Sequence, residues 1–404
     1  MRQPSSRSCY HLVHYPDVHT AVSIQIQTKL PKVGTTIFSV MSQLAAEHGA
    51  INLGQGFPDF EPPEALREAV SRAMADHKNQ YAPGIGIGPL REQIALKIAR
   101  LYGCEVDPAT EITITSGATE ALFSAIAALV SAGDEVIVID PAYDSYEPAI
   151  ELQGARPVRV PLAQPDFRVD WQRIREAVTP KTRMIIVNSP NNPSGSVFSR
   201  ADLDELAALT RGTRIVVLSD EVYEHIVYGP EGHQSVLRHP ELAGRSVVVS
   251  SFGKTYHCTG WKLGYAVAPT ALSQEFRKVH QYLTFCTFNP AQWAFAEFMA
   301  DCPEHYLELP AFYQAKRDRF QALLKPSRLR LLDVPGGYFQ LVDYSAIRDE
   351  DDVDFSRWLI TEAGVAGIPL TPFYAEAPGT RLLRLCFAKS EATMEAAAER
   401  LCKL

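Results

Sequence analysis

The feature that most constrains the fold is an alternation of short apolar runs with helical segments between residues 112 and 267. The runs are rich in β-branched residues and bounded by turn residues, as buried strands are. We expect seven strands, at Ile112–Thr115, Glu135–Ile139, Pro157–Val160, Met184–Val187, Ile215–Leu218, Val247–Val249 and Leu263–Val267. Helical spacing lies between some of them, at Thr119–Val130, Trp171–Ala177 and Ser199–Thr210. This order predicts an α/β fold, a mostly parallel sheet covered by helices on both faces.

The chain on either side of this region has a different character. Helices are expected earlier at Thr35–Glu47, Pro63–Asp76 and Leu90–Leu101, and later at Leu272–Met299, Pro303–Leu324, Val353–Ala363 and Glu391–Leu404. Further strands are expected at Leu329–Leu332, Tyr338–Val342 and Leu382–Cys386. The sequence therefore predicts a poorly ordered arm over 1–28, a smaller α+β domain from 29–65 and 301–404, and a large domain over 66–300.

Composition excludes several classes of function. The net charge is −8 and no basic block occurs, so nucleic acid is not an expected partner. No apolar run is long enough to span a membrane, which predicts a soluble protein. The seven cysteines are scattered without zinc-ligand spacing, so we expect no metal site and a reducing cytoplasm. The glycine-rich stretch at 81–91 lacks the preceding strand and the spacing of a nucleotide-binding fingerprint.

Lys254 follows the strand expected at Val247–Val249, in the stretch Ser251-Phe252-Gly253-Lys254-Thr255. Ligands of open α/β sheets bind outside the carboxyl ends of the strands. Partial burial and a second cation, Lys262, would both lower the pKa of this amine and favour its nucleophilic form. A lysine of this kind suits a covalent bond to a phosphorylated aldehyde cofactor, although the stretch could also be a surface turn.

Other expected strand ends supply the remaining parts of such a cofactor site. Each has an ordinary reading taken alone: a helix cap, an Asn- and Pro-rich turn, a solvated acid, or core packing. Taken together they offer a phosphate cradle at a helix N-terminus, an amide donor, an acid for a ring nitrogen with a nearby hydroxyl, and an aromatic for stacking. The phosphate cradle is Ser116-Gly117-Ala118-Thr119, and the amide donor is Asn192. The acid is Asp220 with the hydroxyl of Tyr223 nearby, and the stacking aromatic is Tyr143.

The sequence resembles the class I/II aminotransferases, fold-type I enzymes that use pyridoxal 5'-phosphate, from about Lys29 to the C-terminus. Within that family it is most similar to the subgroup of methionine aminotransferases and kynurenine–oxoglutarate (glutamine) transaminases. The stretches that carry the resemblance are Asn52-Leu53-Gly54-Gln55-Gly56-Phe57-Pro58-Asp59-Phe60, Ser251 to Lys262, and His280-Gln281-Tyr282-Leu283-Thr284-Phe285.

The resemblance implies a role for each matching residue. Lys254 matches the lysine that bonds to the cofactor, Asp220 the partner of the pyridine nitrogen, and Tyr223 and Asn192 the groups on the ring oxygen. Tyr143 matches the stacking aromatic, and Arg384 matches the clamp for the substrate carboxylate. Gly56, through its backbone, and Asn192 are also expected to bind the substrate. The phosphate site matches Gly117, Ala118, Thr119, Ser251 and Lys262. Many relatives have arginine at the last of these positions, and lysine keeps the charge but loses the fork geometry.

The resemblance also implies a homodimer with shared active sites. Tyr81 would reach the phosphate of the neighbouring subunit, and Phe285 would line its substrate pocket. Dicarboxylate-specific relatives place a second arginine near the latter position, whereas residues 282–289 contain no Arg or Lys here. The expected substrates are therefore an apolar or neutral amino acid (methionine, an aromatic, or glutamine) and a 2-oxo acid, in ping-pong order. A carbon–sulfur β-lyase of the same fold and a non-catalytic cofactor-sensing regulator remain as alternatives.

Overall fold

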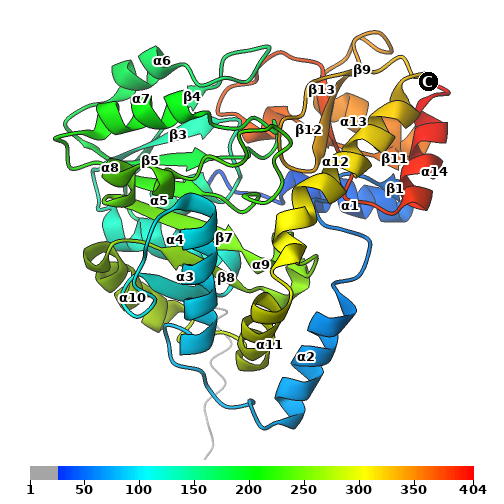
Figure 1. Ribbon diagram of the computed structural model, residues 1–404. Coiled ribbons are helices and arrows are strands. Elements are labelled where there is room, and N and C mark those ends of the chain that lie inside the picture. The colour runs from blue at the N-terminus through cyan, green and yellow to red at the C-terminus, as the bar shows by residue number, and fades with distance from the viewer. Residues whose placement is uncertain (1–25) are drawn as a thin grey trace, which may run out of the picture.

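The computed structural model describes residues 26–404, and the N-terminal arm expected over 1–28 lies almost wholly outside this range. Its largest sheet has seven strands in the order β2-β8-β7-β6-β5-β3-β4 (Figure 1). The strands are β2 (Ile112–Thr115), β3 (Glu135–Asp140), β4 (Arg156–Pro161), β5 (Thr182–Asn188), β6 (Val216–Asp220), β7 (Ser246–Ser251) and β8 (Gly264–Val267). All seven predicted strands are confirmed. Both antiparallel pairings in this sheet involve β8, which runs opposite to the other six strands, so the prediction of a mostly parallel sheet is also confirmed.

Successive residues of each central strand pack into different hydrophobic cores. Met184 and Ile186 of β5 belong to one core and Ile185 and Val187 to another, because side chains alternate across a sheet. One face is covered by α4 (Gly117–Leu129), α5 (Tyr146–Leu152) and α10 (Thr270–Leu283). The other face packs against α3 (Gly88–Tyr102), α6 (Trp171–Ala177), α7 (Arg200–Thr210), α8 (Pro240–Ala243) and α11 (Asn289–Asp301), and α2 (Glu64–Ala75) packs on α11. Burial on both faces explains why these strands are continuous apolar runs.

Two smaller sheets lie to the right of the large sheet in Figure 1, with α12 running diagonally in front of them. One is antiparallel, in the order β12-β13-β10-β9, and the other pairs β1 with β11 in parallel. The strands are β1 (Ile51–Asn52), β9 (Arg330–Leu331), β10 (Phe339–Asp343), β11 (Val365–Ala366), β12 (Ile368–Pro369) and β13 (Leu382–Cys386). The helices are α1 (Ile37–Glu47), α12 (Glu304–Leu324), α13 (Asp352–Ala363) and α14 (Glu391–Leu401).

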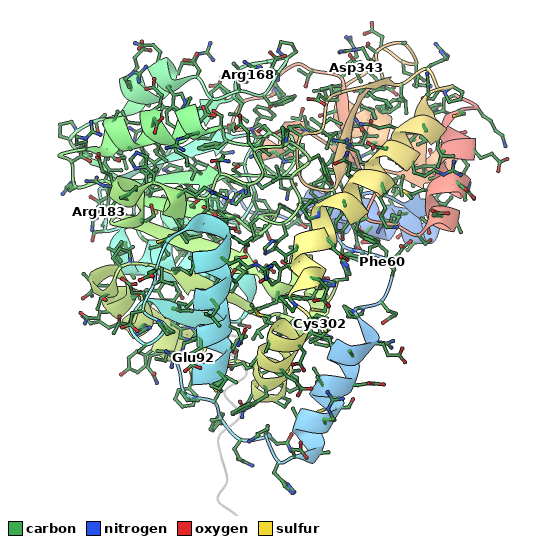
Figure 2. All side chains as sticks on the ribbon, viewed as in Figure 1. Phe60, Glu92, Arg168, Arg183, Cys302 and Asp343 are labelled. Atoms are coloured by element: carbon green, nitrogen blue, oxygen red, sulfur yellow. The ribbon has the colours of Figure 1, made fainter. Side chains whose placement is uncertain are left out.

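The β1–β11 pairing joins the N-terminal segment to the C-terminal part of the chain. Beyond β1 the chain runs past α12 (Figure 2). There the rings of Phe60 and Phe312 pack edge to face, with their centroids 5.7 Å apart. The residues before α2 thus pack mainly with the C-terminal sheets. None of the helices in the described part of the chain combines the length and the apolar character needed to cross a membrane.

The expectation of one helix over Leu272–Met299 is wrong. The structure has two helices there, because α10 ends at Leu283 and α11 begins at Asn289. Phe285 adopts a left-handed backbone with φ of 69°, which a helix cannot continue through. Pro290 then lies in the first turn of α11, where its missing N–H costs nothing. The sequence also gave no sign of α5, which is only seven residues long and contains Pro148.

Candidate active site

A cavity of about 190 Å³ opens at the carboxyl ends of β5, β6 and β7, beside the N-terminus of α4. Its place agrees with the rule that open α/β sheets bind ligands at the strand ends. Ten of the eleven residues predicted to bind the cofactor line it. They are Gly117, Ala118, Thr119, Tyr143, Asn192, Asp220, Tyr223, Ser251, Lys254 and Lys262.

One end of the cavity is built to hold an anion. The first backbone N–H groups of α4 have no partner within the helix and lie at its positive end. Gly117 has φ of +74°, and a Cβ on it would lie 3.5 Å from the Lys262 Nζ. A Cβ on Gly264 of β8 would lie 2.7 Å from the Ser250 carbonyl oxygen and 3.0 Å from Gly117. These two glycines therefore let α4 begin directly against the sheet, with a lysine beside it.

Asp220, at the end of β6, is the buried acid of the cavity. Its Oδ2 accepts a hydrogen bond from the Tyr146 hydroxyl at 2.6 Å, and its Oδ1 accepts one from the Val222 N–H at 3.3 Å. Burial raises the pKa of Asp220 to about 6, against the opposing effect of these donors. A buried carboxylate of this kind is suited to a cationic hydrogen-bond donor. Tyr146 was missed by the sequence analysis because it lies on α5, the short helix that the sequence did not reveal.

Lys254 lies on α9 (Phe252–Thr255), directly after β7. Its Nζ donates to the Gly56 carbonyl oxygen at 2.9 Å and lies 5.7 Å from the ring centres of Tyr223 and Tyr338. Burial lowers the pKa of Lys254 to about 8, and the Lys262 charge acts in the same direction. The lowered pKa expected from the sequence is confirmed, and a useful fraction of this amine is neutral near pH 7 to 8.

The pH dependence of covalent capture tests this lysine. In the cofactor-free protein, only the neutral amine attacks an aldehyde. We expect the rate of pyridoxal phosphate capture at Lys254 to rise with pH to a plateau, with a midpoint near 8. Stopped-flow absorbance measures this rate. A free lysine in a short peptide is the control, with a midpoint near 10.4, and a protein midpoint above 10 would contradict the assignment.

Arg384, in the middle of β13, is buried and lies beside the cavity. It donates to the Asn192 Oδ1 and to the Gly54 carbonyl oxygen, both at 2.6 Å. Its Nε is buried without a hydrogen-bond partner, and no carboxylate of residues 26–404 forms an ion pair with it. A buried cation without a counter-charge is suited to a carboxylate ligand. Because the Asn192 oxygen faces Arg384, the amide nitrogen of Asn192 remains available as a donor.

Gly56 reaches this site through its backbone. Its carbonyl oxygen accepts from Lys254 and also from the Tyr338 hydroxyl at 2.6 Å. A Cβ at this position would lie 2.8 Å from the ring of Phe339, so the close approach requires glycine. Tyr338 was missed by the sequence analysis, because nothing in its local sequence shows that it meets a residue so far away in the chain.

Tyr81 and Phe285 do not line the cavity of their own chain. Both are exposed, at 81% and 45%, and their rings meet edge-on with centroids 5.2 Å apart. The structure thus brings these two predicted residues together on the surface and separates them from the other predicted residues.

Comparison with known proteins identifies the family. The model for aminotransferase class I and II matches residues 48–401. The chain is 55% identical to a methionine aminotransferase of Escherichia coli, over 94% of this chain and 98% of that one. It is 34% identical to rat kynurenine–oxoglutarate transaminase 1, over 93% and 97% of the two chains.

A solved structure gives the same result. The fold superimposes on YbdL from Escherichia coli, described as having a methionine aminotransferase function, with a TM-score of 0.92 and 54% identity, covering 95% of this chain and all of that one. The chain therefore belongs to the class I and II aminotransferases, and its cofactor is pyridoxal 5'-phosphate.

Proposed function

We propose that this aminotransferase takes its amino group from L-methionine, or from another apolar or neutral L-amino acid, and passes it to a 2-oxo acid in ping-pong order. The observation that carries the proposal is the 55% identity, over nearly the whole chain, to a protein named as a methionine aminotransferase. The stretch 282–289 supports it, because it contains no Arg or Lys to neutralise an acidic substrate side chain.

The cavity fits the cofactor at each of its ends. The α4 N-terminus, Ser251 and Lys262 hold the phosphate, where the positive φ of Gly117 lets the backbone come close. Asp220 pairs with the ring nitrogen, since its buried carboxylate has only hydroxyl and N–H donors at present. Tyr223 and the Asn192 amide would donate hydrogen bonds to the ring oxygen, and Tyr143 would stack on the ring. When bound, the protonated ring withdraws electrons from the substrate carbon that carries the amino group.

The protein's own groups then handle the proton. Arg384 binds the substrate carboxylate through its unpartnered Nε–H and the second N–H of a terminal nitrogen, while its other N–H groups hold it to Asn192 and Gly54. Gly56 lies on the same side. Lys254, with its pKa lowered to about 8, accepts the proton from the substrate Cα and, as the general acid–base, would deliver it to the aldehyde-derived carbon of the cofactor. Its hydrogen bond to the Gly56 carbonyl oxygen holds the free amine next to the carboxylate site.

We also propose how the protein assembles and where its domains begin and end. Two subunits form a homodimer in which Tyr81 of each reaches the phosphate site of the other and Phe285 lines the other's substrate pocket. The exposure of both side chains supports this arrangement. The domain limits are those predicted, with 29–65 and 301–404 as the small domain and 66–300 as the large one. The free cysteines among residues 26–404 support a reducing, cytoplasmic location.

A half-reaction tests the function. L-Methionine is added to the cofactor-loaded protein without any oxo acid. The visible band of the lysine-bound cofactor should bleach, the band of its amine form should grow, and one equivalent of 2-oxo-4-methylthiobutanoate per site should appear. Bleaching only with aromatic amino acids would mean that the preferred donor is aromatic, while the reaction is still a transamination. An unchanged spectrum with methionine, together with release of a thiol from a cysteine S-conjugate, whose sulfur is bonded to Cβ, would indicate a β-lyase. Bound cofactor without turnover of either compound would indicate a regulator.

A further inference from the structure

The chain from the last residue of β6 to Glu224 presents its side chains to two environments. Asp220 and Tyr223 line the cavity. Glu221 and Glu224, each the next residue in the chain, do not line it and are buried among other polar groups. A buried carboxylate is costly unless donors surround it, so two of them beside two cofactor residues need an explanation.

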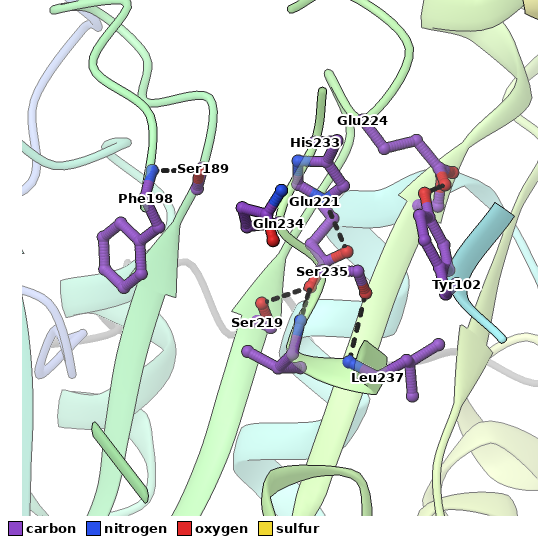
Figure 3. A network of polar contacts seen from close by, with 12 residues as sticks. Tyr102, Ser189, Phe198, Ser219, Glu221, Glu224, His233, Gln234, Ser235 and Leu237 are labelled. Carbon is purple, nitrogen blue, oxygen red and sulfur yellow. Dashed lines mark hydrogen bonds and ion pairs between the residues drawn. The ribbon is translucent and has the colours of Figure 1, made fainter. Parts of the chain in front are cut away.

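The carboxylate of Glu224 accepts hydrogen bonds from four side chains on three elements. Its Oε1 accepts from the Lys97 ammonium of α3 at 2.7 Å and from the Tyr265 hydroxyl of β8 at 2.8 Å. The Ser250 hydroxyl of β7 donates to the same oxygen, and the Tyr102 hydroxyl of α3 donates to Oε2. Figure 3 shows the Tyr102 contact. The carboxylate thus joins α3 to the ends of β7 and β8.

Glu224 is ionised in this environment. Burial alone would raise its pKa, but the Lys97 ammonium, His225 and the donated hydrogen bonds outweigh burial and hold the pKa of Glu224 well below its usual range. The side chains of Lys97 and Glu224 are only 4% and 3% exposed, so water contributes little to either charge. Removing one partner of such a pair leaves an uncompensated buried charge.

The donors of Glu224 are neighbours of cavity residues. Glu224 itself follows Tyr223, and Ser250 precedes Ser251, which lines the phosphate end. Tyr265 faces Ser250 across the β7–β8 pairing. One carboxylate therefore joins the backbone that carries Tyr223 to the strand that leads to Ser251 and Lys254.

Glu221 anchors the other end of the same segment separately. It accepts from the Ser219 hydroxyl and the His233 ring, both at 2.8 Å, and from the Val236 N–H at 3.1 Å (Figure 3). None of these donors belongs to the Glu224 network. Loss of the Glu224 carboxylate should thus make the position of Tyr223 less fixed, whereas Glu221 should still hold the backbone next to Asp220 in place.

We propose that Glu224, paired with Lys97, is a positioning residue that fixes Tyr223 relative to Ser251 and Lys254. The inference rests on the proposed role of Tyr223 as a hydrogen-bond donor to the ring oxygen of the cofactor. That donor stabilises the ionised ring oxygen, so it lowers the pH at which the visible band of the bound cofactor changes. A misplaced Tyr223 raises this pH midpoint, whereas a purely structural role of Glu224 leaves it unchanged.

The test uses the double variant Lys97→Met/Glu224→Gln, which removes both buried charges together. Glu224→Gln alone is expected to lower the melting temperature, because Lys97 is left unpaired, and the double variant is expected to recover it. The double variant should nevertheless show a pH midpoint about one pH unit higher than the parent and a cofactor Kd about tenfold weaker. Absorbance titration measures both quantities.

Glu135→Gln is the matched control. Glu135 is also buried and hydrogen-bonded, to Arg156 and Thr179, but it lies at the first residue of β3, at the opposite end of the strand from the cavity. It should leave the pH midpoint and the cofactor Kd as in the parent. A double variant that melts like the parent and has the parent's midpoint would overturn the proposal.

If the double variant does not fold, Tyr265→Phe replaces it in the test. It removes one donor to Glu224 and keeps both charges, so it should move the midpoint upward by a smaller amount. A folded Tyr265→Phe protein with an unchanged midpoint would also overturn the proposal. If the parent protein shows no band with added pyridoxal phosphate, the proposed function itself has failed, which is a separate outcome.

Discussion

Lys254→Ala is expected to abolish transamination almost completely, with kcat reduced by about 10⁴-fold or more. The alanine can neither bond to the cofactor nor move the substrate proton. The protein groups that bind the phosphate remain, so the protein should still bind pyridoxal phosphate without a covalent link. Steady-state turnover and the loss of the visible band of the lysine-bound cofactor measure the two effects.

A small primary amine added to Lys254→Ala provides a positive control. It can take the proton from solution, but it lacks the fixed position of the lysine, so it should restore only a small part of the activity. Lys262→Ala is the matched lysine variant. It should weaken cofactor binding while keeping the covalent link. Turnover of Lys254→Ala within tenfold of the parent would exclude Lys254 as the acid–base group.

Asp220→Asn should reduce kcat on the order of 10³-fold at saturating cofactor, because a neutral amide does not keep the ring nitrogen protonated. Tyr146→Phe keeps the carboxylate and removes only one donor to it, so a much smaller loss is expected. Rates with both variants under saturating amino acid and oxo acid make the comparison. Equal losses would show that the Tyr146 hydroxyl, and not the charge of Asp220, is what matters.

Asp220→Asn should also change the stability of the cofactor-free protein, by an amount that depends on pH. The pKa of Asp220 is about 6 when folded, above its usual 3.8, so the folded state binds the proton more tightly. The stability from this proton is fully present below pH 4 and is lost as the pH rises through 6, amounting to about 3 kcal/mol. Asp220→Asn removes this loss. Denaturant unfolding of the two cofactor-free proteins should therefore agree near pH 4 and favour the variant at pH 8.

The sequence predicted the large sheet well, because its strands are buried on both faces and leave continuous apolar runs. The limits predicted for β2 and β13 agree with the structure residue by residue. That the cofactor residues line one cavity could be predicted too, since most of them lie at the carboxyl end of a strand or shortly after it, and the carboxyl ends of parallel strands meet at one edge.

What the sequence missed depends on contacts between distant segments. Tyr338 meets Gly56 across 282 residues, and Glu224 takes its donors from α3, β7 and β8. No local pattern encodes either contact. The break between α10 and α11 was missed for another reason. The apolar residues around Phe285 continue the helical spacing, and only the backbone conformation there interrupts the helix.

The tight packing at Gly264 affects what a mutational scan of this enzyme can reveal. Gly264 has no side chain to offer a ligand, yet any larger residue would meet the Ser250 carbonyl oxygen and the start of α4. Selection for activity would reject substitutions at this position as strongly as substitutions of Lys254. Intolerance to substitution would therefore rank the two residues alike, although Lys254 has the proposed catalytic role and Gly264 only lets α4 lie against the sheet. Selection for abundance, scored in parallel, separates them, because only the glycine variants would be lost from both.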